Sequence, residues 1–234
     1  MKTHILFDFF GTLVRYSPSR TEQGYPRSFA LVTGAGARFD YAAFLGLWSE
    51  VSAEFDRGAE QTLREFSMLE VGHAFLLRAL RRTPEPRLVE QFVGAYLAEW
   101  NQGVAYLKGI QQLLERLSSR YTLSIVTNTH QPDLVPEHLR RMGVSQRFRA
   151  VVTSVEFGLR KPHPGIFAHA LDRLTAESQE CVYVGDDFEA DYRGALAAGV
   201  DALLIDPMRQ TPTPEAARLE SIFDLEARLS EEPR

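Results

Sequence analysis

The feature that most constrains the fold is an alternation of short apolar runs with amphipathic helical patterns. Five runs rich in Val, Ile and Leu have the length and weak polar alternation of strands that are covered on both faces. They are residues 4–8, 121–127, 148–154, 180–186 and 201–206. Helical patterns such as "IQQLLERLSS" and "GIFAHALDRL" lie between the later runs. Strands that alternate with helices pair in parallel through right-handed crossovers, so the chain predicts an α/β fold with a five-stranded parallel sheet.

The interval between the first and second runs breaks this alternation. Residues 15–104 contain no convincing strand and instead carry three helical patterns, at 40–55, 62–80 and 86–100. The second pattern opens with Thr62 and Glu65 at the spacing of a capping box. We therefore expect a core domain of residues 1–14 and 105–234, with a helical cap domain of residues 15–104 inserted into it.

Two segments are expected to be irregular. Residues 15–37 contain several prolines and glycines and are predicted to form a linker and an irregular part of the cap. Residues 206–220 are predicted to form a surface loop that precedes a last helix at 221–230.

Composition narrows the classes of partner. The 234 residues carry a net charge of −5, and no run of Lys or Arg stands out, which argues against nucleic acid and anionic membranes as partners. No apolar stretch approaches the length of a membrane span, and the N-terminus lacks the pattern of a signal peptide. The single cysteine, Cys181, lies in an apolar run, which predicts a buried structural thiol in a reducing compartment. We therefore expect a soluble cytoplasmic protein, and the sequence makes no prediction of its oligomeric state.

Polar side chains stand at the carboxyl ends of four of the predicted strands. They are Asp8 after the first strand, Thr127 and Asn128 after the second, Lys161 beyond the third, and Asp186, Asp187 and Asp191 after the fourth. Taken singly, each also has a structural interpretation as a helix cap, a turn residue or a surface lysine. Ligands of open parallel sheets bind beyond these strand ends, so the joint placement favours one functional site.

The chemistry that such a set supports is phosphoryl transfer. Asp8 can act as a nucleophile, and Asp8 with Asp186 can supply the carboxylate oxygens that Mg²⁺ prefers. Thr127 and Lys161 can hold the other phosphate oxygens and neutralise the charge that grows on them. The expected partner is therefore a small phosphorylated molecule.

Four motifs resemble those of the haloacid dehalogenase superfamily, in the order of the family and across nearly the whole chain. "DFFGTL" is similar to the first motif, "VTNT" to the second, "KPHPGIF" to the third and "VGDDFEADYRGALAAG" to the fourth. The helical insertion between the first two matches the helical-cap subfamily. The resemblance implies a doubly wound, Rossmann-like parallel core with a mobile cap, and the hydrolysis of a small phosphomonoester.

The resemblance also implies a role for each candidate residue. Asp8 would be the nucleophile that forms an aspartyl intermediate, and Thr127, Asn128 and Lys161 would bind the transferring phosphate. Mg²⁺ would be held by ligands that come from both ends of the chain: Asp8, the backbone carbonyl of Phe10 and Asp186, with Asp187 or Asp191 in support.

Phe10 departs from the family pattern. Family phosphatases are expected to carry an Asp at this position, which protonates the leaving group and then activates water. General acid–base catalysis is worth roughly 10²–10⁴-fold in rate, which is about 3 to 5.5 kcal/mol of barrier. Family dehalogenases also lack this Asp, because a departing halide needs no proton, but they hold no metal and replace the acidic fourth motif by serine and asparagine.

Three hypotheses follow for the function. The acidic fourth motif favours a Mg²⁺-dependent phosphatase without the usual general acid, since clustered carboxylates repel one another unless a cation is near. Phe10 favours a metal-independent, dehalogenase-like displacement at carbon. A protein that kept the fold and the ion site, but only binds a ligand or partner, is the third. The sequence does not identify the substrate, and no cap residue stands out as its specificity determinant.

Overall fold

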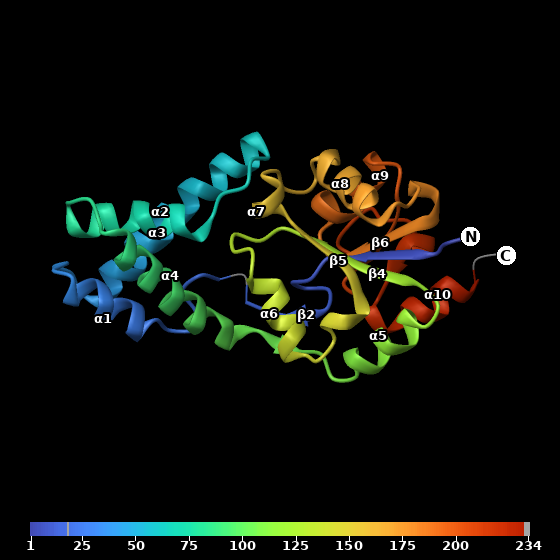
Figure 1. The fold of residues 1–234 in the computed structure, drawn as a ribbon, viewed down its shortest axis with the longest axis horizontal. Helices are drawn as coiled ribbons and strands as arrows, with labels where there is room; N and C mark the ends of the chain where they lie inside the picture. The colour runs from blue at the N-terminus through green and yellow to red at the C-terminus, as the bar shows by residue number, and fades with distance from the viewer. Residues whose placement is uncertain (18, 232–234) are drawn as a thin grey trace. The chain divides into compact units, whose positions relative to one another are not determined.

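The computed structural model describes residues 1–17 and 19–231, and the chain divides into two compact units (Figure 1). The core unit contains Met1–Arg15 and Tyr106–Arg234, and the helical unit contains Tyr16–Ala105. Each unit is described by itself below.

A six-stranded parallel sheet forms the centre of the core unit. Its strand order is β5-β4-β1-β6-β7-β8, and all five pairings are parallel. The strands are β1 His4–Phe7, β4 Thr122–Thr127, β5 Phe148–Thr153, β6 Cys181–Gly185, β7 Asp201–Ile205 and β8 Arg218–Leu219. Five of them lie within the five predicted runs. The predicted strand number was wrong by one, because β8 is only two residues long and a segment of that length carries no periodic pattern.

The strand order places β1 where the direction of the crossovers reverses. From β1 the chain steps through β4 to the edge strand β5, and from β6 on the other side of β1 it steps through β7 to β8. Parallel sheets of this kind bind ligands at such a reversal, beyond the carboxyl ends of the strands. The residues that directly follow β1, β4 and β6 therefore lie at the favoured place for a site.

Helices cover both faces of this doubly wound sheet. In Figure 1, α8 and α9 lie above the sheet, and α5 and α10 lie below it. The helices of the core unit are α5 Ile110–Ser118, α6 Leu134–Arg141, α7 Ser154–Phe157, α8 Pro164–Leu174, α9 Gly194–Ala197 and α10 Leu225–Glu231. A π-helical segment, η4 Phe188–Arg193, leads into α9. Short 3-10 turns are η2 Ser145–Arg147, η3 Ser178–Glu180, η5 Glu215–Ala217 and η6 Ile222–Asp224.

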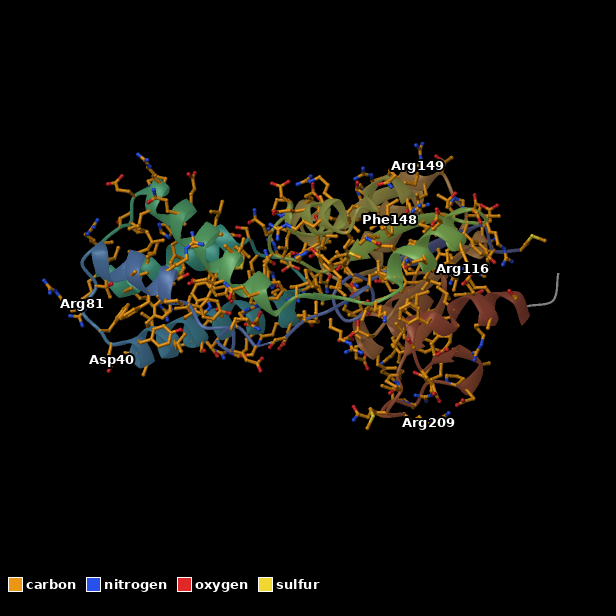
Figure 2. The ribbon with its side chains drawn as sticks, turned by 90° about the horizontal axis from the view of Figure 1, so that it is seen from below. Asp40, Arg81, Arg116, Phe148, Arg149 and Arg209 are labelled. Atoms are coloured by element: carbon orange, nitrogen blue, oxygen red, sulfur yellow. The ribbon has the colours of Figure 1, made fainter. Side chains whose placement is uncertain are left out.

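The segment predicted to be a surface loop before the last helix contains β8 and a buried ion pair. The carboxylate of Asp206 accepts hydrogen bonds from the backbone N–H of Gln210 (2.9 Å) and Thr211 (3.1 Å) and from the guanidinium of Arg218. Arg209, labelled in Figure 2, lies on the same loop and pairs with Glu215 at 2.6 Å. These contacts hold the loop that connects β7 to β8 at the edge of the sheet.

The helical unit has a core of aromatic side chains. Its helices are α1 Pro26–Gly34, α2 Tyr41–Thr62, α3 Met68–Leu80 and α4 Pro86–Trp100, followed by the 3-10 turn η1 Asn101–Gly103. The ring of Trp48 lies 5.3 Å from those of Phe75 and Phe92 and 4.5 Å from that of Tyr96. Figure 2 shows Asp40, which caps the start of α2, and Arg81, which ends α3, at the same end of this unit. Helices α2 and α3 are therefore antiparallel.

Helix α1 lies inside the segment that was predicted to be irregular, and over Pro26–Gly34 that prediction was wrong. The buried carboxylate of Glu99, on α4, accepts hydrogen bonds from the backbone N–H of Arg27 (2.7 Å) and Ser28 (3.1 Å). These N–H groups belong to the first turn of α1 and have no partner within the helix. Pro26 at the first helical position is a local signal, but Tyr25 makes no side-chain cap and the capping carboxylate is distant in sequence. Residue 18, in the same predicted linker, lies outside the described residues.

The predicted capping box at Thr62 and Glu65 was also wrong. Leu63 has a left-handed backbone with φ 55°, which ends α2, and α3 begins only at Met68. The hydroxyl of Ser67 accepts from the N–H of Glu70 (3.2 Å), and the carboxylate of Glu70 accepts from the N–H of Ser67 (2.7 Å). Both pairs have the same sequence spacing, and the turn at Leu63 decides between them.

Two very short strands, β2 Val14–Arg15 and β3 Ala105–Tyr106, form a separate two-stranded sheet. Within residues 1–17 and 19–231, no helix combines the length and the apolarity that a membrane crossing requires.

Candidate active site

Asp8 occupies the first position after β1 and is held from two sides. Its side chain is buried, and its Oδ1 accepts hydrogen bonds from the Thr127 hydroxyl (2.8 Å) and the Lys161 ammonium (2.7 Å). The described residues donate no hydrogen bond to its Oδ2. Thr127 is the last residue of β4, so the two neighbouring parallel strands end at the same edge and bring both side chains together. One carboxylate oxygen is thus fixed and the other is available for reaction.

Lys161 lies between the carboxylates of this site. Its Nζ donates to Oδ1 of Asp8, to Oδ1 of Asp191 at 2.5 Å and to the hydroxyl of Tyr183 at 2.7 Å. The lysine is only 3% exposed. A buried ammonium is tolerated when opposite charges and hydrogen-bond acceptors surround it. The two carboxylates satisfy that requirement for Lys161.

The side-chain amide of Asn128 holds the backbone of Lys161. Its Nδ2 donates to the Lys161 carbonyl at 3.1 Å, and its Oδ1 accepts from the Lys161 N–H at 2.8 Å. These two bonds tie the end of β4 to the segment that follows α7. In this arrangement Asn128 positions the lysine, and a contact of Asn128 with substrate stays a prediction.

The two outer acids of the fourth motif differ from Asp191. Asp191 is buried, and its Oδ2 accepts from the backbone N–H groups of Asp186 and Asp187, each at 3.0 Å. The carboxylate of Asp186 is exposed and accepts from the Thr12 hydroxyl at 3.1 Å. The carboxylate of Asp187 instead accepts from the N–H of Ala190 at 2.7 Å and caps the η4 segment.

Two glycines make the close approach of these acids possible. Gly11 has φ +90°, and a Cβ built there would overlap the carboxylate of Asp186. A Cβ at Gly185 would likewise overlap the carboxylate of Asp191. Only glycine allows a left-handed backbone without strain and leaves space for a neighbouring side chain. The turn at Gly11 therefore allows Asp186 to lie next to the loop that carries Asp8.

Phe10 has an aromatic rather than an acidic environment. Its ring lies 5.0 Å from that of Phe9 and 6.1 Å from that of His138, both in edge contacts. A phenyl ring neither donates nor accepts a proton, so this side chain cannot act as a general acid or base. Its backbone carbonyl is the atom that the family resemblance assigns to a metal.

Burial and charge shift the acid–base equilibria of the site. Burial raises the pKa of Asp8 to about 6; Asp191 adds to this rise, while Lys161 and Thr127 oppose it. The removal of water from around its carboxylate is the largest cause that raises the pKa of Asp186 to about 7, and the charges of Asp8 and Asp191 add to the rise. Burial alone would lower the pKa of Lys161, but Asp191 and Asp8 outweigh it and raise that pKa. The lysine is therefore charged at neutral pH, and the carboxylates repel one another.

The carboxylate group fits a hard divalent cation. Oxygens of Asp8, Asp186 and Asp191 all lie within 4.8 Å of one another. Mg²⁺ is bound by carboxylate oxygens at about 2.0–2.1 Å and keeps several waters. The carboxylates of Asp8 and Asp186 offer such oxygens, whereas both oxygens of Asp191 accept hydrogen bonds from the protein. A cation between Asp8 and Asp186 would offset the negative charge of Asp8, which adds to the rise in the pKa of Asp186.

The structure brings together most of the residues that the sequence singled out. Asp8, Thr127, Lys161 and Asp191 form one connected hydrogen-bond network, with Asp186 beside it. Two further members were missed. Thr12 follows the glycine turn, and Tyr183 lies inside β6, where a buried hydroxyl among aliphatic residues was a usable signal because it requires a partner.

Comparisons with known proteins identify the family of the chain. The family described as haloacid dehalogenase-like hydrolase matches residues 48–205. A ribulose-1,5-bisphosphate 5-phosphatase of Halopiger xanaduensis is 27% identical, over 93% of this chain and 90% of that protein. A glyceraldehyde 3-phosphate phosphatase of Methanopyrus kandleri is 34% identical, over 66% of this chain and 67% of that protein.

Solved structures show the same fold. A 2-haloacid dehalogenase from Pseudomonas syringae superposes with a TM-score of 0.77 at 22% identity, and each chain is covered completely. The L-2-haloacid dehalogenase from Xanthobacter autotrophicus gives a TM-score of 0.66 at 17% identity, also with complete coverage. The family match spans more than half of the chain. The protein therefore belongs to the haloacid dehalogenase-like hydrolase family and is a phosphatase-like hydrolase.

Proposed function

We propose that this protein is a Mg²⁺-dependent phosphatase that acts on a small phosphorylated metabolite through an aspartyl intermediate at Asp8. The observation that carries the proposal is the environment of Asp8. One of its oxygens is fixed by a hydroxyl and an ammonium, and a second carboxylate, Asp186, lies close enough to share a cation with it. The two curated phosphatases to which the chain is similar support the same reaction class.

The reaction proceeds in two displacements at phosphorus. In the first, Oδ2 of Asp8 attacks the phosphorus atom, the bond to the leaving oxygen breaks, and the leaving group takes a proton from water. In the second, water attacks the aspartyl phosphate, the bond between phosphorus and Asp8 breaks, and inorganic phosphate departs. Lys161 and the hydroxyl of Thr127 neutralise the charge beside the transferring group. Mg²⁺, held by Asp8, the carbonyl of Phe10 and Asp186, would supply charge neutralisation and orientation of the phosphate.

The remaining acids and Asn128 support this arrangement. Asp191 orients Lys161 and the loop that carries Asp186, and Asp187 stabilises the start of η4. Asn128 holds the backbone of Lys161, and we expect it to contact the phosphate. We further propose that residues 15–104 act as a cap that sets substrate choice, and that the enzyme works in the cytoplasm, since its one cysteine is buried and free.

Phe10 determines which phosphate esters are good substrates. Without an acid at this position the leaving group departs as an anion, so the rate should fall steeply as its basicity rises. Phe10→Asp should raise kcat on alkyl phosphates by about 10²-fold or more, the range that a positioned general acid supplies. On aryl phosphates, whose leaving groups need no proton, the same change should have little effect. An equal effect on both series would contradict the assignment.

The experiment that tests the proposal is a hydrolysis screen over phosphate esters with Mg²⁺ and with EDTA. Activity should appear only with the metal and should be abolished in Asp8→Asn, which keeps the shape of the side chain. Asp186→Asn should raise the Mg²⁺ concentration needed for half-maximal activity more than Asp187→Asn does. Of these two acids, only Asp186 belongs to the group of carboxylates that could hold a metal ion. Activity that persists in EDTA, or in Asp8→Asn, would refute the proposal.

A second candidate function rests on the same aromatic residue. Phe10 suits a displacement at carbon, because a departing halide needs no proton. This alternative predicts halide release from 2-haloacids without added metal, and the carboxylate group would then have no partner cation. Release of halide in EDTA that is lost in Asp8→Asn would favour it over the phosphatase. Tight binding of Mg²⁺ without turnover of either class would instead indicate a binding protein.

A further inference from the structure

We propose that Tyr183 is a positioning residue for the phosphoryl transfer, and that its hydroxyl fixes the ammonium of Lys161 against Asp8 before the substrate arrives. This inference rests on the function proposed above. Tyr183 lies on β6 and is completely buried. It is the third residue before Asp186. Tyr183 is not among the residues proposed to bind the metal or the phosphate.

The first step of the argument is the number of donors on Lys161. An ammonium has three N–H donors and no acceptor. The three acceptors of Lys161 are Oδ1 of Asp8 (2.7 Å), Oδ1 of Asp191 (2.5 Å) and the hydroxyl of Tyr183 (2.7 Å). All three donors are therefore used, and the orientation of the ammonium about its own axis is set by the protein. The tyrosine supplies the only neutral contact among the three.

The second step is what holds the hydroxyl itself. The Tyr183 hydroxyl donates to the carbonyl oxygen of Val126 at 2.7 Å, with Oδ1 of Asp191 as an alternative acceptor at 3.0 Å. Val126 directly precedes Thr127, whose hydroxyl donates to the same oxygen of Asp8 as the lysine does. One hydroxyl thus connects Lys161 to the strand that carries the other partner of Asp8. The lysine and the threonine are held in one frame around the nucleophile.

The third step is why a tyrosine, rather than a smaller hydroxyl, suits this position. The ring of Tyr183 packs edge-on against Phe167, with centroids 5.3 Å apart, and Nζ of Lys161 lies 5.3 Å from the centre of the ring. Burial, together with Asp191 and Asp8, raises the pKa of Tyr183 well above its usual range. The hydroxyl therefore keeps its proton and donates to Val126 while it accepts from Lys161.

Tyr183→Phe is a clean perturbation of this contact. The change keeps the ring and its packing, and it removes only one oxygen atom. It leaves one N–H of Lys161 and the carbonyl of Val126 without that partner. Tyr121→Phe, near the opposite end of β4, is the matched control because it removes a hydroxyl that has no hydrogen bond within the described residues.

A spectroscopic readout of the contact does not depend on any enzymatic activity. The chain has three lysines, Lys2, Lys108 and Lys161, so ¹⁵N labelling of lysine gives at most three ammonium signals in an NMR spectrum. Lys2→Arg and Lys108→Arg assign the signal of Lys161 by elimination. Its protons should exchange slowly with water in the unmodified protein. In Tyr183→Phe the exchange should accelerate by about tenfold, because one of the hydrogen bonds that protect them is lost.

Kinetics on a phosphate ester give the second readout. Tyr183→Phe should lower kcat by about ten- to hundredfold, the cost of misplacing a catalytic group. KM should change by less than about twofold, because the buried hydroxyl does not touch substrate. Tyr121→Phe should change neither. A purely structural role would lower the melting temperature of Tyr183→Phe and leave kcat unchanged at a temperature where the variant is folded.

The outcomes separate this inference from the proposed function. Unchanged exchange of the Lys161 protons, or accelerated exchange with an unchanged kcat, would overturn the role of Tyr183. A rise in KM with unchanged kcat would also overturn it, since that pattern belongs to a substrate contact. If the unmodified protein hydrolyses no phosphate ester, the proposed phosphatase fails, while the NMR experiment still decides whether Tyr183 anchors the lysine.

Discussion

Lys161→Met is the substitution whose effect on stability the structure specifies most sharply. Methionine keeps a similar unbranched shape and removes the charge. The carboxylates of Asp8 and Asp191, both buried, would then face each other without the ammonium that lies 2.7 and 2.5 Å from them. Removing one member of a buried ion pair costs about 3–5 kcal/mol, because an uncompensated charge is left behind. We expect a loss of that size in the free energy of unfolding of the core unit, measured in EDTA.

The assay is urea denaturation at pH 8 followed by far-UV circular dichroism. Tryptophan emission is a second, local probe, because both tryptophans, Trp48 and Trp100, lie within Tyr16–Ala105 and report on the helical unit. Lys108→Met is the matched control. Lys108 is exposed, so its replacement should change the free energy of unfolding by no more than about 0.5 kcal/mol.

A second test compares how much Mg²⁺ stabilises Lys161→Met and the unmodified protein. A ligand at about 100 times its Kd stabilises the folded state by about 2.7 kcal/mol. Because the variant has lost a positive charge beside the carboxylates, Mg²⁺ should stabilise Lys161→Met more than it stabilises the unmodified protein. A loss below about 1 kcal/mol in EDTA would refute the reasoning, since it falls outside the range for breaking a buried pair. Equal stabilisation of both proteins by Mg²⁺ would refute the placement of the cation.

Three further predictions follow from other contacts. In EDTA the raised pKa values of Asp8 (about 6) and Asp186 (about 7) mean that the native state retains protons that unfolded carboxyls, with a pKa of about 3.9, have released. This contribution to stability is fully present below about pH 4 and is lost as the pH rises to about 7. The melting temperature in EDTA should therefore fall between pH 5 and pH 8, and it should fall less when Mg²⁺ is present. Gly11→Ala should cost about 1–3 kcal/mol from its backbone conformation alone and weaken Mg²⁺ binding measured by calorimetry, whereas Gly94→Ala, in a helix with open space around it, should stabilise by about 0.5–1 kcal/mol. Glu99→Ala should leave the N–H groups of Arg27 and Ser28 unpaired and lower the urea midpoint reported by tryptophan emission by the equivalent of about 1–3 kcal/mol.

The strands were predictable because each of them has a local sequence pattern that does not depend on residues elsewhere in the chain. A run such as residues 181–185 contains no charged residue and is buried over its whole length, so its composition alone indicates a central strand. The convergence of Asp8, Thr127 and Lys161 followed from the rule that parallel strands end at one edge. Neither inference needed knowledge of a distant partner.

The missed features all depend on a partner elsewhere in the chain. Helix α1 takes its cap from Glu99, which lies on α4, and Arg218 of β8 forms a buried ion pair with Asp206 at the other end of the preceding loop. Tyr183 was passed over as one more apolar residue of β6, although its hydroxyl contacts Lys161, Val126 and Asp191. Local patterns carry no information about contacts of this kind, because the chain must first be folded to form them.

Family membership and the chemistry at Phe10 rest on different parts of the chain. The family match begins at residue 48, so it supports the fold and the later motifs and leaves out both Asp8 and Phe10. In the proposed mechanism the lysine, the threonine and a cation held by the carboxylates would stabilise charge at the transferring group whatever the leaving group is. Phe10 affects only the transfer of a proton to the leaving group. The barrier lowering of roughly 3 to 5.5 kcal/mol that a general acid would supply matters most for strongly basic leaving groups. A phosphate ester of a weakly basic leaving group loses little of its rate at such a site. The slope of log kcat against the pKa of the leaving group therefore measures what Phe10 removes, and Phe10→Asp should flatten that slope.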